Sequence, residues 1–190
     1  MGREMIKAAA RELLDAGFSV IPIRMDGSKA PACSSWAEFA ERPPTPLQFD
    51  NLFRFDCGFG VCGNVHGVEI LDFETREIYD LWSELAEEEF PGLLASLAKA
   101  RTPGGGVHVY VRSDCVEGNQ KLAVAREKYV DSSGKERRVL IESRGRGGYV
   151  IAPPSPGECH PSGVAYKMLT GPSVRDGRWC SGEERNGVFR

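Results

Sequence analysis

Three short segments that lie far apart in the chain each combine an apolar run with a glycine-rich turn and a charged side chain. They are GVEILDFET at 67–75, TPGGGVHVYV at 102–111 and IESRGRGGYVIAPPS at 141–155. Short apolar runs bounded by turn residues predict buried β-strands, and glycine lets a turn approach neighbouring backbone closely. Acidic residues and a histidine at the edges of such strands suggest a divalent metal and a polyphosphate ligand.

The composition is that of an ordinary globular protein with one large domain. The 190 residues are 41% apolar and 27% charged, and no apolar run approaches the ~20 residues that span a membrane. The N-terminus lacks the apolar block of a signal peptide, so we expect a cytoplasmic protein. The net charge of −3 argues against a protein that coats duplex DNA through bulk positive charge.

Positive charge is nevertheless dense in one stretch, between positions 121 and 146. The residues are Lys121, Arg126, Lys128, Lys135, Arg137, Arg138, Arg144 and Arg146. A local cluster of this kind can bind nucleic acid even in an acidic chain, because the electric field depends on how charge is distributed.

The six cysteines contain no pair at the CxxC spacing of a zinc site or a redox dithiol. In a cytoplasmic chain we therefore expect free thiols. Cys159 is followed directly by His160, but we do not expect a metal site there.

Hydrophobic periodicity and turn residues predict both helices and strands. Helices are expected at 4–16, 45–53 and 92–100 and after Thr75. Strands are expected at 18–23, 58–62, 68–73, 107–111, 148–152 and 164–168, with a hairpin over 121–142 that turns at 131–134. We predict a domain over 1–170, then an exit linker and the start of a helical region over 171–190. The chain is expected to be the N-terminal part of a longer protein.

The first segment supplies a pair of carboxylates. Residues two apart on a strand point to the same face, so Asp72 and Glu74 project together. Glu142 could add a third carboxylate from a neighbouring strand, and hard divalent cations prefer such oxygens. An alternative is that Asp72 and Glu74 only stabilise the helix that begins after Thr75, because negative charge is favourable near the N-terminus of a helix.

The second segment places a histidine after a glycine turn. His108, Tyr110 and Arg112 share one face of the predicted strand, and the glycines let backbone approach a ligand. His108 could donate a hydrogen bond to a triphosphate oxygen. Taken alone, His108 is better explained as a structural histidine on a half-buried strand, which is also what we expect for His66 and His160.

The order of these motifs resembles the primase-polymerase (prim-pol) family, the phage and plasmid branch of the archaeo-eukaryotic primases, over roughly residues 5–170. The matching residues are Gly17, Pro22, Lys29, Pro31, Trp36, Asp72, Glu74, His108, Glu142, Arg144, Gly147, Gly148, Tyr149, Ala152, Pro153, Pro154 and Ser155. The family usually has Asp at the positions of Glu74 and often at Glu142, and a Ser or Thr where Thr102 stands. Glu184, Arg185 and Asn186 are similar to the start of the helical region that follows this domain in relatives.

The resemblance implies an α/β (α+β) fold with a mixed or antiparallel sheet of the archaeo-eukaryotic primase type, which carries the metal site and is flanked by helices. It implies a DNA primase and polymerase that makes primers on a single-stranded template from NTPs or dNTPs, with helical and helicase regions in the same polypeptide. The implied metal ligands for Mg²⁺ or Mn²⁺ are Asp72, Glu74 and Glu142. The implied nucleotide-binding residues are His108, Arg144, Lys29, Thr102 and Gly105. No zinc is expected, since the interval between His108 and Glu142 holds only Cys115.

Two other functions fit the same residues. A metal-dependent nuclease uses a similar set of carboxylates. A module without catalytic activity could instead bind single strands for an attached replicative helicase.

Overall fold

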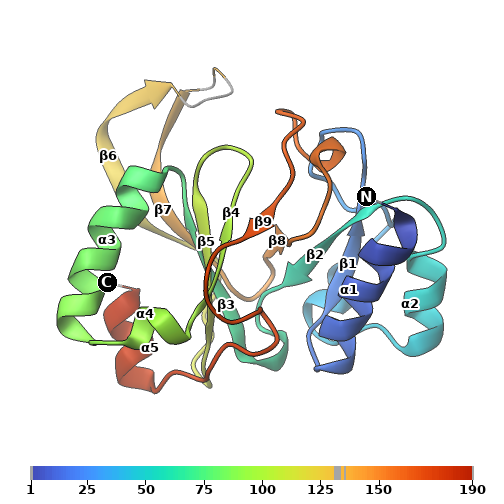
Figure 1. Cartoon of the computed structure of the whole chain (residues 1–190), viewed down its shortest axis with the longest axis horizontal. Coiled ribbons are helices and arrows are strands. Elements are labelled where there is room, and N and C mark those ends of the chain that lie inside the picture. Colours follow the sequence, from blue (N-terminus) through green and yellow to red (C-terminus); the bar gives the residue numbers. More distant parts are fainter. Residues whose placement is uncertain (1, 131–133, 135, 190) are drawn as a thin grey trace.

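The chain forms two antiparallel sheets flanked by helices (Figure 1). The computed structural model describes residues 2–130, 134 and 136–189. The small sheet has the order β1 (Val20–Ile23), β2 (Gly58–Cys62), β8 (Tyr149–Ile151). The large sheet has the order β6 (Gln120–Val130), β7 (Glu136–Arg144), β3 (Val68–Phe73), β5 (Val107–Arg112), β4 (Ala98–Arg101), β9 (Lys167–Met168).

The helices are divided between the two sheets. They are α1 (Arg3–Asp15), α2 (Pro46–Leu52), α3 (Arg76–Glu89), α4 (Leu93–Ser96) and α5 (Gly182–Val188). Figure 1 shows α1 and α2 beside the small sheet, and α3, α4 and α5 together beside the large sheet. Short 3₁₀ turns cover Ala37–Ala40, Val65–Gly67 and Gly157–Cys159. Within the described residues, none of these helices has the length and apolar character needed to cross a membrane.

The central strand β3 is buried on both faces. Ile70 packs into the core shared by α1, α2 and the small sheet. Leu71 packs into a second core with side chains of α3, α4 and α5. Since successive strand residues point to opposite faces, Asp72 lies on the side of the small sheet and Glu69 on the side of α5.

The helix starts follow from local sequence. Thr45 forms a capping box with Gln48, in which each side chain bonds the backbone N–H of the other, and Pro46 occupies the first helical position. The Thr75 hydroxyl accepts a hydrogen bond from the Ile78 N–H at 3.3 Å and caps α3. β3 ends at Phe73, so Asp72 lies on the strand, whereas Glu74 lies in the short segment between the strand and this cap.

One expected element is wrong in its second half. The predicted helix over 92–100 is helical only in α4, after which the chain becomes strand β4. β4 pairs with β5 along its whole length, and Ala98 and Ala100 are fully buried in the core. Pairing with a buried strand therefore outweighs the high helix propensity of alanine. The strands expected at 164–168 and 148–152 are also shorter in the structure, as β9 and β8.

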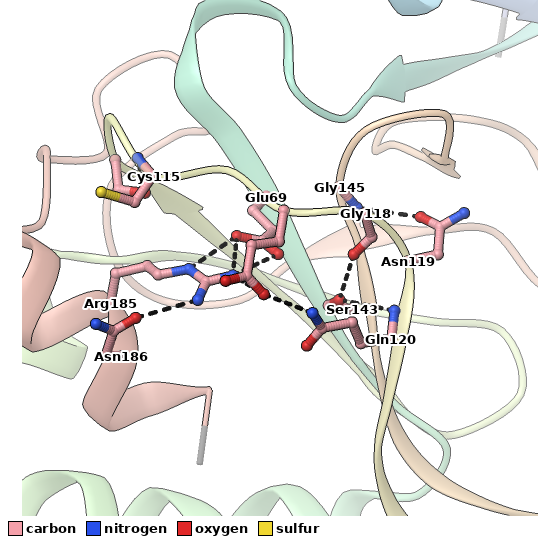
Figure 2. Close-up of polar contacts among 11 residues, drawn as sticks. Glu69, Cys115, Gly118, Asn119, Gln120, Ser143, Gly145, Arg185 and Asn186 are labelled. Carbon is pink, nitrogen blue, oxygen red and sulfur yellow. Dashed lines mark hydrogen bonds and ion pairs between the residues drawn. The ribbon is translucent and has the colours of Figure 1, made fainter.

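The C-terminal helix is tied to the large sheet by a buried ion pair (Figure 2). Arg185 of α5 donates to both carboxylate oxygens of Glu69, with Nε–Oε2 at 3.0 Å and Nη2–Oε1 at 2.9 Å. The side chains are 5% and 0% exposed. Val188 and Phe189 pack into the same core as α3. The predicted boundary at residue 170 stays a prediction, but the described part of 171–190 packs on the sheet.

Candidate active site

Asp72 lies at the centre of a row of polar residues on three adjacent strands. Its position on β3 pairs with His108 on β5 and with Glu142 on β7. The His108 Nε2 atom lies 3.4 Å from Asp72 Oδ1. Directly paired residues of antiparallel strands have their side chains on the same face, so this row is a consequence of sheet register.

The carboxylates of this row influence each other. Burial raises the pKa of Glu142, and the nearby charge of Asp72 adds to this, while an ion pair with Arg144 opposes it. Burial also acts to raise the pKa of Asp72, but His108, Arg144 and Lys29 outweigh that effect, so its pKa lies below the usual value. Nearby positive charge therefore stabilises a pair of acids that would otherwise repel each other.

The turn before His108 fits closely against the end of β3. The Thr102 hydroxyl accepts a hydrogen bond from the Gly106 N–H at 3.1 Å. A Cβ atom at Gly106 would lie 1.9 Å from the carbonyl oxygen of Phe73, so only glycine allows this approach. Gly105 has φ +96°, in the left-handed region that favours glycine. The Gly105 N–H also donates to the Thr102 carbonyl oxygen at 3.1 Å, so the turn is held beside the carboxylates.

All eight residues expected at the site line one cavity of about 500 Å³. They are Lys29, Asp72, Glu74, Thr102, Gly105, His108, Glu142 and Arg144. The cavity lies on the face of the large sheet that turns toward the small sheet. Segments that are far apart in the sequence therefore converge there, as the motif pattern predicted, although the role of each residue stays a prediction.

A second cavity of about 380 Å³ adjoins the first. Both cavities share walls made by Asp72, His108 and Arg144. The second cavity is also lined by Trp36 and Tyr149, whose rings meet edge to face with centroids 5.0 Å apart. Aromatic rings of this kind can receive a nucleobase, and Asp72 lies where the two cavities meet.

Several residues that line the first cavity were not expected from the sequence. Tyr166 is 5% exposed and stacks near His108, with ring centroids 6.2 Å apart. His160, which we expected to be structural, also reaches the cavity. Burial, with a contribution from Lys29, lowers the pKa of His160 to about 4, so it is neutral at physiological pH. Both residues follow glycine- and proline-rich loops whose sequence has no period that could have marked them.

The basic stretch forms the long hairpin β6–β7 (Figure 1). Lys128 pairs with Glu136 at 2.7 Å, and both side chains are more than half exposed. Arg138 donates to the carbonyl oxygens of Ala125 and Arg126. Lys135 and the expected turn residues 131–133 lie outside the described residues. The hairpin contributes Tyr129, Val130 and Arg137 to the first cavity.

The residues present fit a hard divalent cation in donor type, but they do not form a complete ligand set. Across residues 2–130, 134 and 136–189, no three His, Cys, Asp or Glu side chains are grouped closely enough to hold a metal ion. Asp72 and Glu142 are adjacent carboxylates, and Glu74 lines the same cavity. Carboxylate oxygens are the ligands that Mg²⁺ and Mn²⁺ prefer.

A protein-family model covers most of the chain. The model of the bifunctional DNA primase/polymerase N-terminal domain matches residues 10–181, so the chain belongs to this family. No curated protein matches the sequence. Membership makes the protein a nucleotidyltransferase of the primase/polymerase type, a class that acts on DNA and nucleotides and generally depends on divalent metals.

Proposed function

We propose that the protein synthesises primers on single-stranded DNA by template-directed nucleotidyl transfer with two divalent metal ions. The observation that carries this proposal is the row Glu142–Asp72–His108, which faces a cavity that also receives a glycine turn and two cationic side chains. Such an arrangement combines groups for metal, phosphate and nucleotide in one place.

The carboxylates have the metal-binding role in this proposal. Asp72 and Glu142 are held in register by the sheet, and Glu74 follows on the loop between β3 and α3. Held by these residues, two divalent metal ions would stabilise the attacking and leaving oxygens of the reaction. The adjacent strands keep the carboxylates in place before any ligand arrives, so little reorganisation is needed.

The phosphates of the incoming nucleotide lie against the turn and the cationic side chains. His108 and the backbone of Gly105 line the cavity together with Arg144 and Lys29. The ion pair with Glu142 holds the Arg144 guanidinium at the edge of the cavity, so Arg144 can bind a phosphate from the position it already has. Charge-assisted hydrogen bonds of this type are stronger than neutral ones.

The template is proposed to follow the basic hairpin. Tyr129 and Arg137 of the hairpin line the cavity, so a strand bound there leads directly to the carboxylates. The helical and helicase regions expected in the same polypeptide, and the cytoplasmic location, remain part of this proposal.

One assay separates the proposal from its alternatives. Labelled NTPs or dNTPs are supplied with an unlabelled single-stranded template and Mg²⁺ or Mn²⁺. Labelled products longer than one nucleotide support the proposal. Shortening of an end-labelled template without synthesis would indicate a nuclease. Template binding with neither reaction would indicate a binding module without catalytic activity.

A further inference from the structure

An apolar groove lies on the side of the large sheet that faces away from Asp72. It has a volume of about 710 Å³, larger than either of the two cavities beside Asp72. Its walls come from α3, the hairpin strands and the turn of α5 at Gly187. Its apolar lining includes Leu81, Trp82, Leu85, Ala123, Leu140 and Ile141.

The exposure of the α3 side chains in this groove is unusual for a helix that packs on a sheet. Leu81 is 61% exposed and Leu85 is 66% exposed, although they lie one helical turn apart on the wall of the groove. Val124 of β6, next to the lining residue Ala123, is 49% exposed. Contiguous exposed apolar surface of this kind marks a binding site more often than single exposed residues do.

The shape of the groove favours a helical occupant. Leu81 and Leu85 form a ridge with i, i+4 spacing along α3, and such ridges pack between the side chains of a second helix. The hairpin side of the groove contains the small side chain of Ala123 beside Ile141, its paired residue. The small residue leaves room for a large apolar side chain from the occupant.

The charge around the groove selects a basic occupant. The end of α3 carries Glu84, Glu87, Glu88 and Glu89, all exposed, without an intervening Lys or Arg. Among the described residues that line the groove, the charged ones are Glu88 and Glu89. Opposite charges across an interface direct association and fix the orientation of the partner.

We propose that this groove binds an amphipathic helix of a partner protein, whose apolar stripe is flanked by Lys and Arg. The helix lies along α3, with its apolar side chains between Leu81, Leu85 and the hairpin and its cations beside the glutamates. Ile141 and Glu142 are successive residues of β7 and point to opposite faces. The partner therefore binds behind the catalytic face and leaves the nucleotide cavity open.

The test uses two synthetic peptides of about 14 residues, the length of α3. Both carry the same leucine stripe at i, i+3 and i+4 spacing, and the flanking residues are Lys in one and Glu in the other. Binding to the whole protein is measured by the anisotropy of a fluorescent label. We expect the Lys peptide to bind, and the Glu peptide to bind at least roughly tenfold more weakly.

Two variants locate the binding. Leu81→Ser with Leu85→Ser should weaken the Lys peptide roughly tenfold or more, because central apolar anchors dominate such interfaces. Leu47→Ser, at a leucine of α2 that is 74% exposed, is the matched control and should change nothing. Glu88→Lys with Glu89→Lys, at the two charged residues that line the groove, should reverse the preference toward the Glu peptide. The substituted leucines are mostly exposed, so these variants should fold as the wild type does.

Several results would overturn the proposal. Equal affinity for the two peptides would show that the glutamates of α3 do not select a basic occupant. An unchanged affinity in the double serine variant would place the peptide elsewhere on the surface. A concentration-dependent dimer that the double serine variant converts to monomer would show that a second copy of the chain covers the groove.

Discussion

Asp72 and Glu142 are directly paired residues on β3 and β7, so two carboxylates share one face at neighbouring positions of the same sheet. Two buried carboxylates at neighbouring positions repel each other unless a positive charge lies nearby. Accordingly, the pKa of Glu142 is raised, first by burial and also by the charge of Asp72. The sheet register maintains this pairing, and any shift of one residue between the strands would send one carboxylate to the opposite face.

Replacing Asp72 tests the metal site. Asp72→Asn keeps the shape of the side chain but removes the charge that His108, Arg144 and Lys29 stabilise, so synthesis should be abolished and the melting temperature should fall modestly while the protein stays folded. Primer synthesis and thermal unfolding are measured on the same preparation. Asp114→Asn, at an exposed position outside the cavity, is the matched control. Normal synthesis by a pure Asp72→Asn protein would rule out the proposed site.

Replacing His108 tests the nucleotide site. If His108 holds phosphate, His108→Ala should raise the nucleotide concentration needed for half-maximal synthesis roughly tenfold to a hundredfold, since a charged hydrogen bond is worth ~1.5–3 kcal/mol. Affinity for template should remain near that of the wild type, which a separate binding measurement checks. A drop in template affinity with unchanged nucleotide affinity would assign His108 a different role.

Neutralising the hairpin tests template capture. The triple variant Arg126→Gln, Lys128→Gln and Arg137→Gln should bind single strands more weakly and with a shallower salt dependence. The slope should fall by ~0.7 for each phosphate that the variant no longer neutralises. Binding is measured across a salt series. A second triple variant, Arg3→Gln, Arg54→Gln and Arg175→Gln, removes the same charge elsewhere. Equal effects of the two triple variants would mean that only net charge matters.

A buried thiol should make stability depend on pH. Burial raises the pKa of Cys62 to about 12, above the ordinary value of 9.0. The contribution of the protonated thiol to the free energy of unfolding is therefore fully present below pH ~9. It is lost as the pH rises toward the pKa of the folded protein, because the thiol of the unfolded chain releases its proton first. Between pH 8 and pH 10 the decrease in the free energy of unfolding from this one thiol should be about 1.4 kcal/mol.

Urea unfolding at both pH values measures this effect. Between pH 8 and pH 10 the free energy of unfolding of Cys62→Ala should fall by about 1.4 kcal/mol less than that of the wild type. Cys115→Ala, at the exposed cysteine, should retain the wild-type difference. If the wild type and Cys62→Ala respond identically to pH, then the thiol does not contribute to the pH dependence.

Strand positions with strong apolar patterns could be predicted from the sequence. The expected strands at 58–62 and 68–73 agree with β2 and β3, and the glycine turn at 104–106 precedes β5 as expected. These features are local: a short apolar run between turn residues specifies a strand without reference to the rest of the chain.

Long-range pairing could not be predicted in the same way. β2 and β3 follow each other closely in sequence but lie in different sheets, and β2 instead pairs with β8 from near residue 150. Tyr166 and His160 reach the cavity through irregular loops, whose path depends on packing rather than periodicity. The residues that the motifs supplied on strands and in the glycine turn could therefore be placed together from the sequence, whereas Tyr166 and His160 could not.

The ion pair between Glu69 and Arg185 determines where this protein can be shortened. The family match ends at residue 181, before Arg185. A fragment trimmed to that match would lose the guanidinium partner of Glu69, which lies on the same strand as Asp72, together with the buried side chains of Val188 and Phe189. Removing one member of a buried pair costs ~3–5 kcal/mol, a large part of the ~5–15 kcal/mol that holds a domain together. Such a fragment should be much less stable than the intact chain, so its inactivity would report the loss of stability and not the chemistry of the site.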